Sequence, residues 1–198
     1  MQTILFIDGR NFIGKLKEIL DPENKKDKDV DFSTYNFSGL FNKVLSGIKI
    51  DEKLFYISRL VKDERTKEKS EKLIEAQRNL KNNLEKQNIK VIFAGWVRAN
   101  VNKCPKGHEM LVFKEKGADV KIAVDMISWS CDKKLNTAII ASSDSDLQPA
   151  IKELKDRGTK RIYLGFENSP NKGLTFTTNQ TILIRNSEIL EFVGKTLL

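Results

Sequence analysis

Short, continuous apolar runs alternate along this chain with segments that have the spacing of helices. Runs of this kind are typical of strands that are buried on both faces, and their alternation with helices predicts a parallel sheet covered on both sides. We therefore expect an α/β fold, a three-layer α/β/α sandwich with a mainly parallel central sheet. The expected strands cover residues 2–8, 53–60, 89–97, 137–142, 161–166 and 181–184.

Helices are expected between these strands. Their ranges are 11–20, a segment capped by Ser33 or Thr34, 73–88, a helix opened by Gly117, 147–157, and a short last helix capped by Ser187. Residues 61–72 are highly charged, which favours a mobile loop or an exposed helix end. Residues 98–116 have no clear period, so they are expected to form a loop or a hairpin insertion.

Length and charge narrow the class of protein. The chain has 198 residues, which favours a single domain over 1–198. Its formal net charge is +8 and its pI is about 9.4, which favours a polyanionic partner, although a soluble lysine-rich surface is the simpler alternative. No apolar run is long enough to span a membrane, and residues 1–8 do not resemble a signal peptide, so we expect a cytoplasmic protein.

Cysteine and histidine are too scarce for several kinds of chemistry. The chain has two cysteines and one histidine, which rules out a disulfide framework and an HExxH metal site. Cys104 and His108 lie close together, but a structural zinc site needs four ligands. Any catalysis is therefore expected to depend on carboxylates.

Three segments bring carboxylates to the same edge of the expected sheet. Asp8 ends the first strand, Asp144 and Asp146 follow the fourth, and Asp119 begins the helix that precedes the fourth strand. Ligands of open parallel sheets bind beyond the carboxyl ends of the strands. Clustered carboxylates repel one another, so they are either neutralised by protonation or stabilised by a bound divalent cation, and Mg²⁺ and Mn²⁺ prefer oxygen ligands.

Simpler roles for these acids remain open. A single aspartate at a strand end is usually a turn residue or a helix cap, and either Asp144 or Asp146 could cap the following helix. Asp125 lies six residues after Asp119, which places it about 120° around the helix and about 9 Å along it. It is therefore ranked below the other four acids as a ligand.

Three motifs, in order, resemble the NYN domain family in its LabA-like branch. They are residues 6–11 (FIDGRN), 114–126 (KEKGADVKIAVDM) and 141–149 (ASSDSDLQP). Ser143 stands where the family usually has a glycine. The resemblance implies a PIN-like, Rossmann-like nuclease fold and RNA cleavage that depends on Mg²⁺ or Mn²⁺.

The resemblance also implies roles for individual residues. Asp8, Asp119, Asp144 and Asp146 would bind the metal, with Asn11 beside them in the catalytic site. Asp125 and Ser142 would support these ligands. Lys116, close to Asp119 in the motif, would contact RNA phosphate. Independently of the resemblance, the basic segment that begins at Trp96 and includes Arg98 is expected to contact single-stranded or structured RNA, and Arg10 is a further expected contact.

Two of these RNA contacts have a simpler alternative. Lys116 could be an ordinary solvated lysine, and Trp96 could belong to the core at a strand end. The oligomeric state is left open, with a homodimer as one option.

The expected function is therefore a metal-dependent ribonuclease. The alternative is a non-catalytic RNA-binding or regulatory NYN-domain protein that keeps the fold and the acids. A phosphatase of the DxDxT type is disfavoured, because the residues after Asp8 do not supply that motif.

Overall fold

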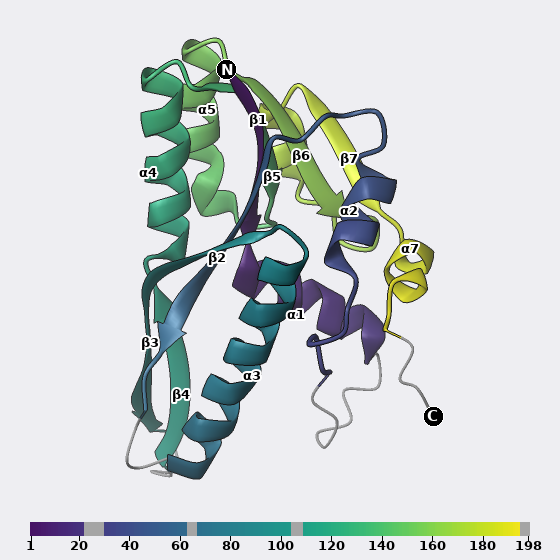
Figure 1. The fold of residues 1–198 in the computed structure, drawn as a ribbon. Coiled ribbons are helices and arrows are strands. Elements are labelled where there is room, and N and C mark those ends of the chain that lie inside the picture. The colour runs from purple at the N-terminus through teal and green to yellow at the C-terminus, as the bar shows by residue number, and fades with distance from the viewer. Residues whose placement is uncertain (22–29, 63–66, 104–108, 195–198) are drawn as a thin grey trace.

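The computed structural model describes residues 1–21, 30–62, 67–103 and 109–194 (Figure 1). Within these ranges seven strands form one sheet in the order β4-β3-β2-β1-β5-β6-β7. Neighbouring strands are parallel, except that β3 and β4 form an antiparallel pair. The strands are β1 (Gln2–Asp8), β2 (Glu52–Leu60), β3 (Lys90–Lys103), β4 (Glu109–Lys116), β5 (Leu135–Ala141), β6 (Lys160–Phe166) and β7 (Gln180–Ile184).

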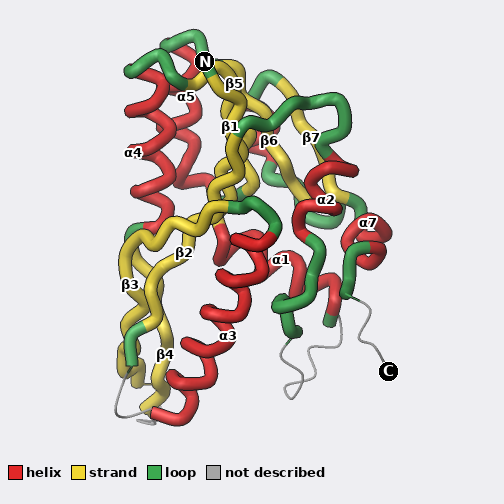
Figure 2. Tube along the Cα trace, in the orientation of Figure 1, coloured by secondary structure: helices red, strands yellow, loops and turns green. Residues whose placement is uncertain are grey.

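Helices cover both faces of this sheet, which confirms the α/β/α fold (Figures 1 and 2). One face carries α1 (Gly9–Leu20), α2 (Phe37–Val44), α3 (Lys67–Lys86) and α7 (Asn186–Glu191). The other carries α4 (Ala118–Cys131), the 3₁₀ turn η2 (Ser145–Leu147), α5 (Gln148–Asp156) and α6 (Lys172–Thr177). None of the helices in the described ranges is both long and apolar enough to cross a membrane.

Strand β1 shows why the apolar runs are continuous. Its side chains point alternately to the two faces, so Leu5 and Ile7 pack under α1 while Ile4 and Phe6 pack under α4 and α5. All four are fully buried. A strand with a core on each side needs apolar residues at every position, which is the pattern that the sequence shows.

The order of the strands places a crevice beside β1. The chain moves outward from β1 through β2 and β3, and later returns to place β5 on the other side of β1. In open α/β sheets, such a reversal separates the loops at the carboxyl ends of the two strands and creates a binding crevice. The start of α1 after Asp8 and the loop after Ala141 meet at this point.

Several local expectations are corrected by the structure. Of the two options for residues 98–116, the structure has the hairpin, but β3 extends beyond the expected strand, and α6 was not expected at all. The side chain of Asn36, rather than Ser33 or Thr34, caps α2 by accepting a hydrogen bond from the amide of Gly39 at 2.8 Å. The cap position of α7 is Arg185, two residues before the expected Ser187.

Candidate active site

Asp8 is held at the point where β1 becomes α1. Its Oδ1 accepts a hydrogen bond from the amide of Asn11 at 3.1 Å, and its Oδ2 accepts one from the hydroxyl of Ser142 at 3.0 Å. The first bond caps α1, and the second links β1 to the loop after β5. Only 8% of Asp8 is exposed, so the carboxylate is held in one orientation at the edge of the pocket.

The surroundings of position 9 explain why a glycine follows Asp8. A Cβ atom at this position would lie 2.6 Å from the carbonyl oxygen of Tyr56 and would also meet the side chains of Phe55 and Ile57. Only glycine lets α1 begin so close to β2. The close approach places Asp8 directly against the neighbouring strand, where it is the register partner of Tyr56.

The loop after β5 is organised around Ser142. Its hydroxyl oxygen donates to Asp8 and accepts a hydrogen bond from the amide of Asp144 at 3.0 Å. The Oδ1 of Asp144 accepts from the amide of Asp146 at 2.9 Å and caps the η2 turn. Ser142 therefore connects the acid at the end of β1 with the acid that follows β5.

Asn11 and Ser143 form a second connection between the same two segments. The Oδ1 of Asn11 accepts hydrogen bonds from the amide of Ser143 at 3.0 Å and from its hydroxyl at 2.7 Å. The backbone of Ser143 does not have the positive φ that would require the usual glycine. Its hydroxyl instead provides a contact that glycine could not make.

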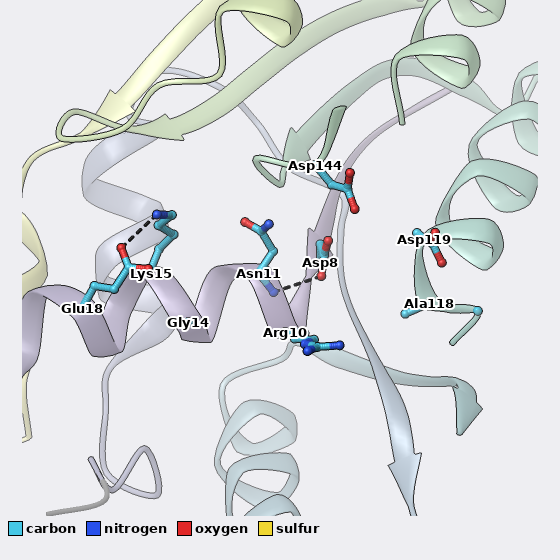
Figure 3. Close-up of a pocket in the computed structure, with 10 residues that line it drawn as sticks. Asp8, Arg10, Asn11, Gly14, Lys15, Glu18, Ala118, Asp119 and Asp144 are labelled. Carbon is cyan, nitrogen blue, oxygen red and sulfur yellow. Dashed lines mark hydrogen bonds and ion pairs between the residues drawn. The ribbon is translucent and has the colours of Figure 1, made fainter. Parts of the chain in front are cut away.

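Asp119 approaches the same pocket from α4. Figure 3 shows Asp8 and Asp144 close together, with Asp119 on the opposite side. Asp119 lies in the first turn of α4, where the helix dipole favours an acid. The residue before this helix, Gly117, has a φ of +100°, and glycine adopts this conformation without strain.

Together these residues border a cavity of about 400 Å³. Four of its lining side chains carry carboxylates, those of Asp8, Glu18, Asp119 and Asp144, and Arg10 and Lys15 contribute positive charge. Among the residues that the structure describes, no three acidic, cysteine or histidine side chains form a ready-made metal-binding group. The carboxylates share the pocket, but they are not gathered into one shell of ligands.

Two acids of the expected site lie elsewhere. Asp146 is exposed and is not among the residues that line the pocket. Asp125 is buried at the side of α4 that faces β2, where its Oδ2 accepts a hydrogen bond from the hydroxyl of Tyr56 at 3.0 Å. Its Oδ1 forms an ion pair with Lys121 at 2.6 Å. Asp125 therefore fastens α4 to β2 and does not face the pocket.

The expected RNA contacts fall into two groups. Arg10 is exposed and lines the pocket. Trp96 is 57% exposed, which excludes the alternative that it belongs to the core, and it pairs in register with the exposed Lys116. Arg98 pairs in register with Lys114 further along the hairpin. The pair of possible zinc ligands, Cys104 and His108, lies outside the described residues.

Sequence reasoning missed several residues of the site. Lys15 and Glu18 line the pocket and form an ion pair at 2.8 Å. Their spacing from Asn11 is that of one helix face, so the helical period could have indicated them. Asn171 is harder to foresee: its side-chain amide donates to the carbonyl of Ser143 at 2.8 Å, from a helix that the sequence pattern did not indicate.

Comparisons with known proteins agree with this architecture. The family model described as "NYN domain" matches residues 2–185. A crystal structure of a protein of unknown function from Vibrio parahaemolyticus, VPA0982, is similar over 92% of this chain and 93% of that chain. Its TM-score is 0.58 and its sequence identity is 16%, so it supports the fold alone. No curated protein matches the chain.

Proposed function

The chain belongs to the NYN domain family, and on this premise we propose that it is a ribonuclease that depends on Mg²⁺ or Mn²⁺. The proposal assigns hydrolysis of RNA phosphodiester bonds to the pocket between β1, β5 and α4. It places the chain in the LabA-like branch of the family and its substrate among cytoplasmic RNAs, since two cysteines and a basic surface suit a reducing compartment rich in polyanions.

One observation carries the proposal: Ser142 joins Asp8 and Asp144 at the ends of two neighbouring parallel strands. Its hydroxyl donates to the first acid and accepts from the amide of the second, each at 3.0 Å. The sheet therefore holds two acids in fixed positions at one crevice, and α4 brings Asp119 to the same cavity.

The donor set suits a hard divalent cation. All three candidate ligands supply carboxylate oxygens, and Mg²⁺ in proteins is usually held by one or two carboxylates while it keeps several waters. Asp8 and Asp144 would bind the ion, with Asp119 as a further ligand on the opposite wall. Asp119 has no hydrogen-bond or ion-pair partner in the described part of the chain, so it has acceptor capacity to offer. An ion bound there would polarise a scissile phosphate and lower the pKa of a bound water.

The other residues of the pocket bind and orient the substrate. Arg10 and Lys15 are the cations of the cavity lining, and they would contact phosphate oxygens of the bound strand. Asn11 holds the loop of Ser143 against α1, which keeps Asp8 and Asp144 in fixed positions relative to each other. The net charge of +8 would steer RNA toward the protein.

A non-catalytic RNA-binding protein is the second candidate. The exposed Trp96 beside the exposed Lys116 favours it, because a base-stacking side chain and a phosphate contact can bind RNA without cleavage. Both candidates bind RNA, so a binding assay alone does not separate them.

The test measures decay of end-labelled RNA with Mn²⁺, with Mg²⁺ and with a chelator. The wild type is compared with Asp8→Asn and with a matched control, Asp132→Asn, which changes an exposed acid at the far end of α4. We expect decay with the wild type and the control, and none with Asp8→Asn. Equal decay by all three proteins, or no decay with either ion, would reject the ribonuclease and leave the binding protein.

A further inference from the structure

A second cavity lies between α5, α6 and the start of β6, at the amino ends of the strands rather than at their carboxyl ends. Its volume is about 620 Å³. Lys152, Lys155 and Arg161 supply three cationic side chains to its lining, together with the aromatic ring of Phe176 and a single acid, Asp156. It shares no lining residue with the candidate active site.

The base of this cavity is built around a buried arginine. Arg161 is 7% exposed; its Nε donates to the Oδ1 of Asn179 at 3.1 Å, and its Nη1 donates to the carbonyl of Thr177 at 2.9 Å. Burial lowers the pKa of its guanidinium, and the charge of Asp156 opposes this shift. These bonds hold the chain that follows α6 against β6, so the end of α6 has a defined position.

Phe176 occupies that defined position, but its ring is in solvent. It is 94% exposed, the highest value among the large hydrophobic residues of the described chain. Proteins that bind single-stranded nucleic acids combine a positively charged groove with aromatic side chains on which unpaired bases stack, and Phe176 beside the cations of this cavity matches that combination.

The two lysines of the cavity lie on the neighbouring helix, α5. Lys152 and Lys155 are three residues apart on α5, so they lie on one face, and both are exposed. Neither has an ion-pair partner among the residues that the structure describes. By contrast, Arg157, which follows α5 as its C-cap, is paired with Glu153 of that helix at 2.5 Å.

Helix α6 connects this cavity physically to the candidate active site. At its start, Asn171 donates a hydrogen bond to the carbonyl of Ser143, which lies between Ser142 and Asp144. Phe176 is five residues later, about 7.5 Å along the helix axis. On α5, Gln148 lies one turn before Lys152 and two turns before Lys155, so this face also starts at the η2 turn. An extended strand that leaves the active site could follow these two helices.

We propose that the cavity between α5 and α6 is an accessory binding site for single-stranded RNA, in which Phe176 stacks on an unpaired base and Lys152 and Lys155 contact the adjacent phosphates. The inference rests on the proposed RNA substrate. It adds a second point of attachment, so the protein favours strands long enough to reach from Asp144 past Phe176. Arg161 is a positioning residue that holds the end of α6.

The test is fluorescence anisotropy with labelled single-stranded RNA of graded length, from about 4 to about 16 nucleotides, in a chelator so that no cleavage occurs. Phe176→Ala should weaken binding of the longest RNA about tenfold, and the loss should shrink as the RNA is shortened. Phe176→Trp should retain binding, because it keeps a stacking surface. The double variant Lys152→Gln/Lys155→Gln should reduce the slope of log Kd against log salt by about 1.4.

Two matched controls separate this site from general effects. Leu190→Ala removes another exposed apolar side chain, on α7, and Lys86→Gln/Lys90→Gln removes two exposed charges at the end of α3 and the start of β3, four strands away from β6 in the sheet. Both should bind RNA as the wild type does. If they lose as much affinity as the test variants, the effect is one of total charge or apolar surface, and the accessory site is rejected.

The remaining outcomes distinguish this inference from the proposed function. If the wild type binds none of the RNAs, whatever their length, the proposal that RNA is the substrate is rejected, and the accessory site is rejected with it. If the wild type binds and cleaves long RNA and Phe176→Ala does both equally well, only the accessory site is overturned. If Phe176→Ala no longer binds a polyglutamate peptide that the wild type binds, but still binds RNA as the wild type does, the cavity binds an acidic protein segment instead.

Discussion

The hydroxyl of Ser142 donates a hydrogen bond to the carboxylate of Asp8 across the boundary between β5 and β1, with an Oγ–Oδ2 distance of 3.0 Å. Both residues are buried, at 4% and 8% exposure. The two are 134 positions apart in sequence, so this bond reports directly on how the sheet brings the ends of distant strands together.

Ser142→Ala tests the energetic value of that contact. The substitution leaves the Oδ2 of Asp8 and the amide of Asp144 without this partner, and a lost hydrogen bond to a charged group costs about 2 kcal/mol. We expect the free energy of unfolding, measured with urea, to fall by about that amount. Ser145→Ala, at an exposed position of the same loop, serves as the control. Equal stability of the two variants would mean that the bond contributes nothing to the fold.

Tyr56→Phe tests the connection between β2 and α4. The change keeps the ring but removes the hydroxyl that donates to Asp125, and it leaves a buried carboxylate with one partner fewer. We expect a loss of about 2 kcal/mol in unfolding free energy. Tyr35→Phe is the matched control, because that buried hydroxyl donates to the neutral carbonyl of Ile189 and its loss should cost about 1 kcal/mol. A smaller loss for Tyr56→Phe than for Tyr35→Phe would contradict the role given to Asp125.

Alkaline pH provides an independent check on Tyr56. Burial raises the pKa of its phenol well above the ordinary value of 10.0, and the charge of Asp125 raises the pKa further. The folded state therefore keeps a proton that the unfolded state loses, so the stabilisation is complete below pH 10.0 and is lost progressively as pH rises above it. Tyr56→Phe should make the fall in stability above pH 10 shallower by about 1.4 kcal/mol per pH unit. An unchanged slope in urea unfolding between pH 9 and 11, about one unit on either side of this phenol's ordinary value, would contradict it.

The location of Asp8 and Asp144 at the ends of neighbouring strands could be predicted from the sequence, for a physical reason. Continuous apolar runs identify strands buried on both faces, and parallel strands bring their carboxyl ends to one edge. The register of Ile7 with Ala141 confirms that β1 and β5 are neighbours that end together. Helical geometry likewise gave a reason to separate Asp125 from Asp119, and in the structure Asp125 turns to β2 instead.

Other parts of the site depend on information that local patterns do not contain. Asp144 and Asp146 are two residues apart, and only the η2 turn decides that the first lines the pocket while the second is exposed. Helix α6 is six residues long, too short to show a period, so the contact of Asn171 with Ser143 could not be foreseen. A hairpin was one of the two options for residues 98–116, but the length of its strands could not be predicted because their register is set by pairing with each other.

Salt should weaken RNA binding steeply if the protein's positive charges contact RNA phosphates. Each lysine or arginine that neutralises a phosphate releases a counterion, so the logarithm of the affinity falls linearly with the logarithm of the salt concentration, by about 0.7 per contact for a single strand. With a net charge of +8, we expect a slope that corresponds to several contacts, measured by anisotropy in a chelator. Little change between about 50 and about 200 mM salt would mean that the charge serves solubility alone.

Asp144→Asn separates cleavage from binding and from folding. The Asn side chain keeps an oxygen that can accept from the amide of Asp146, so the η2 turn should survive. Loss of a negative ligand should abolish cleavage, while RNA binding stays or tightens because repulsion of phosphate falls. Ion binding to the folded state raises the melting temperature, so the wild type should gain stability when Mn²⁺ is added and the variant should gain less. The exposed-acid variant Asp132→Asn should gain as much as the wild type. If Mn²⁺ raised the melting temperature of Asp144→Asn and of the wild type equally, Asp144 would not be a ligand, even if its substitution stopped RNA decay.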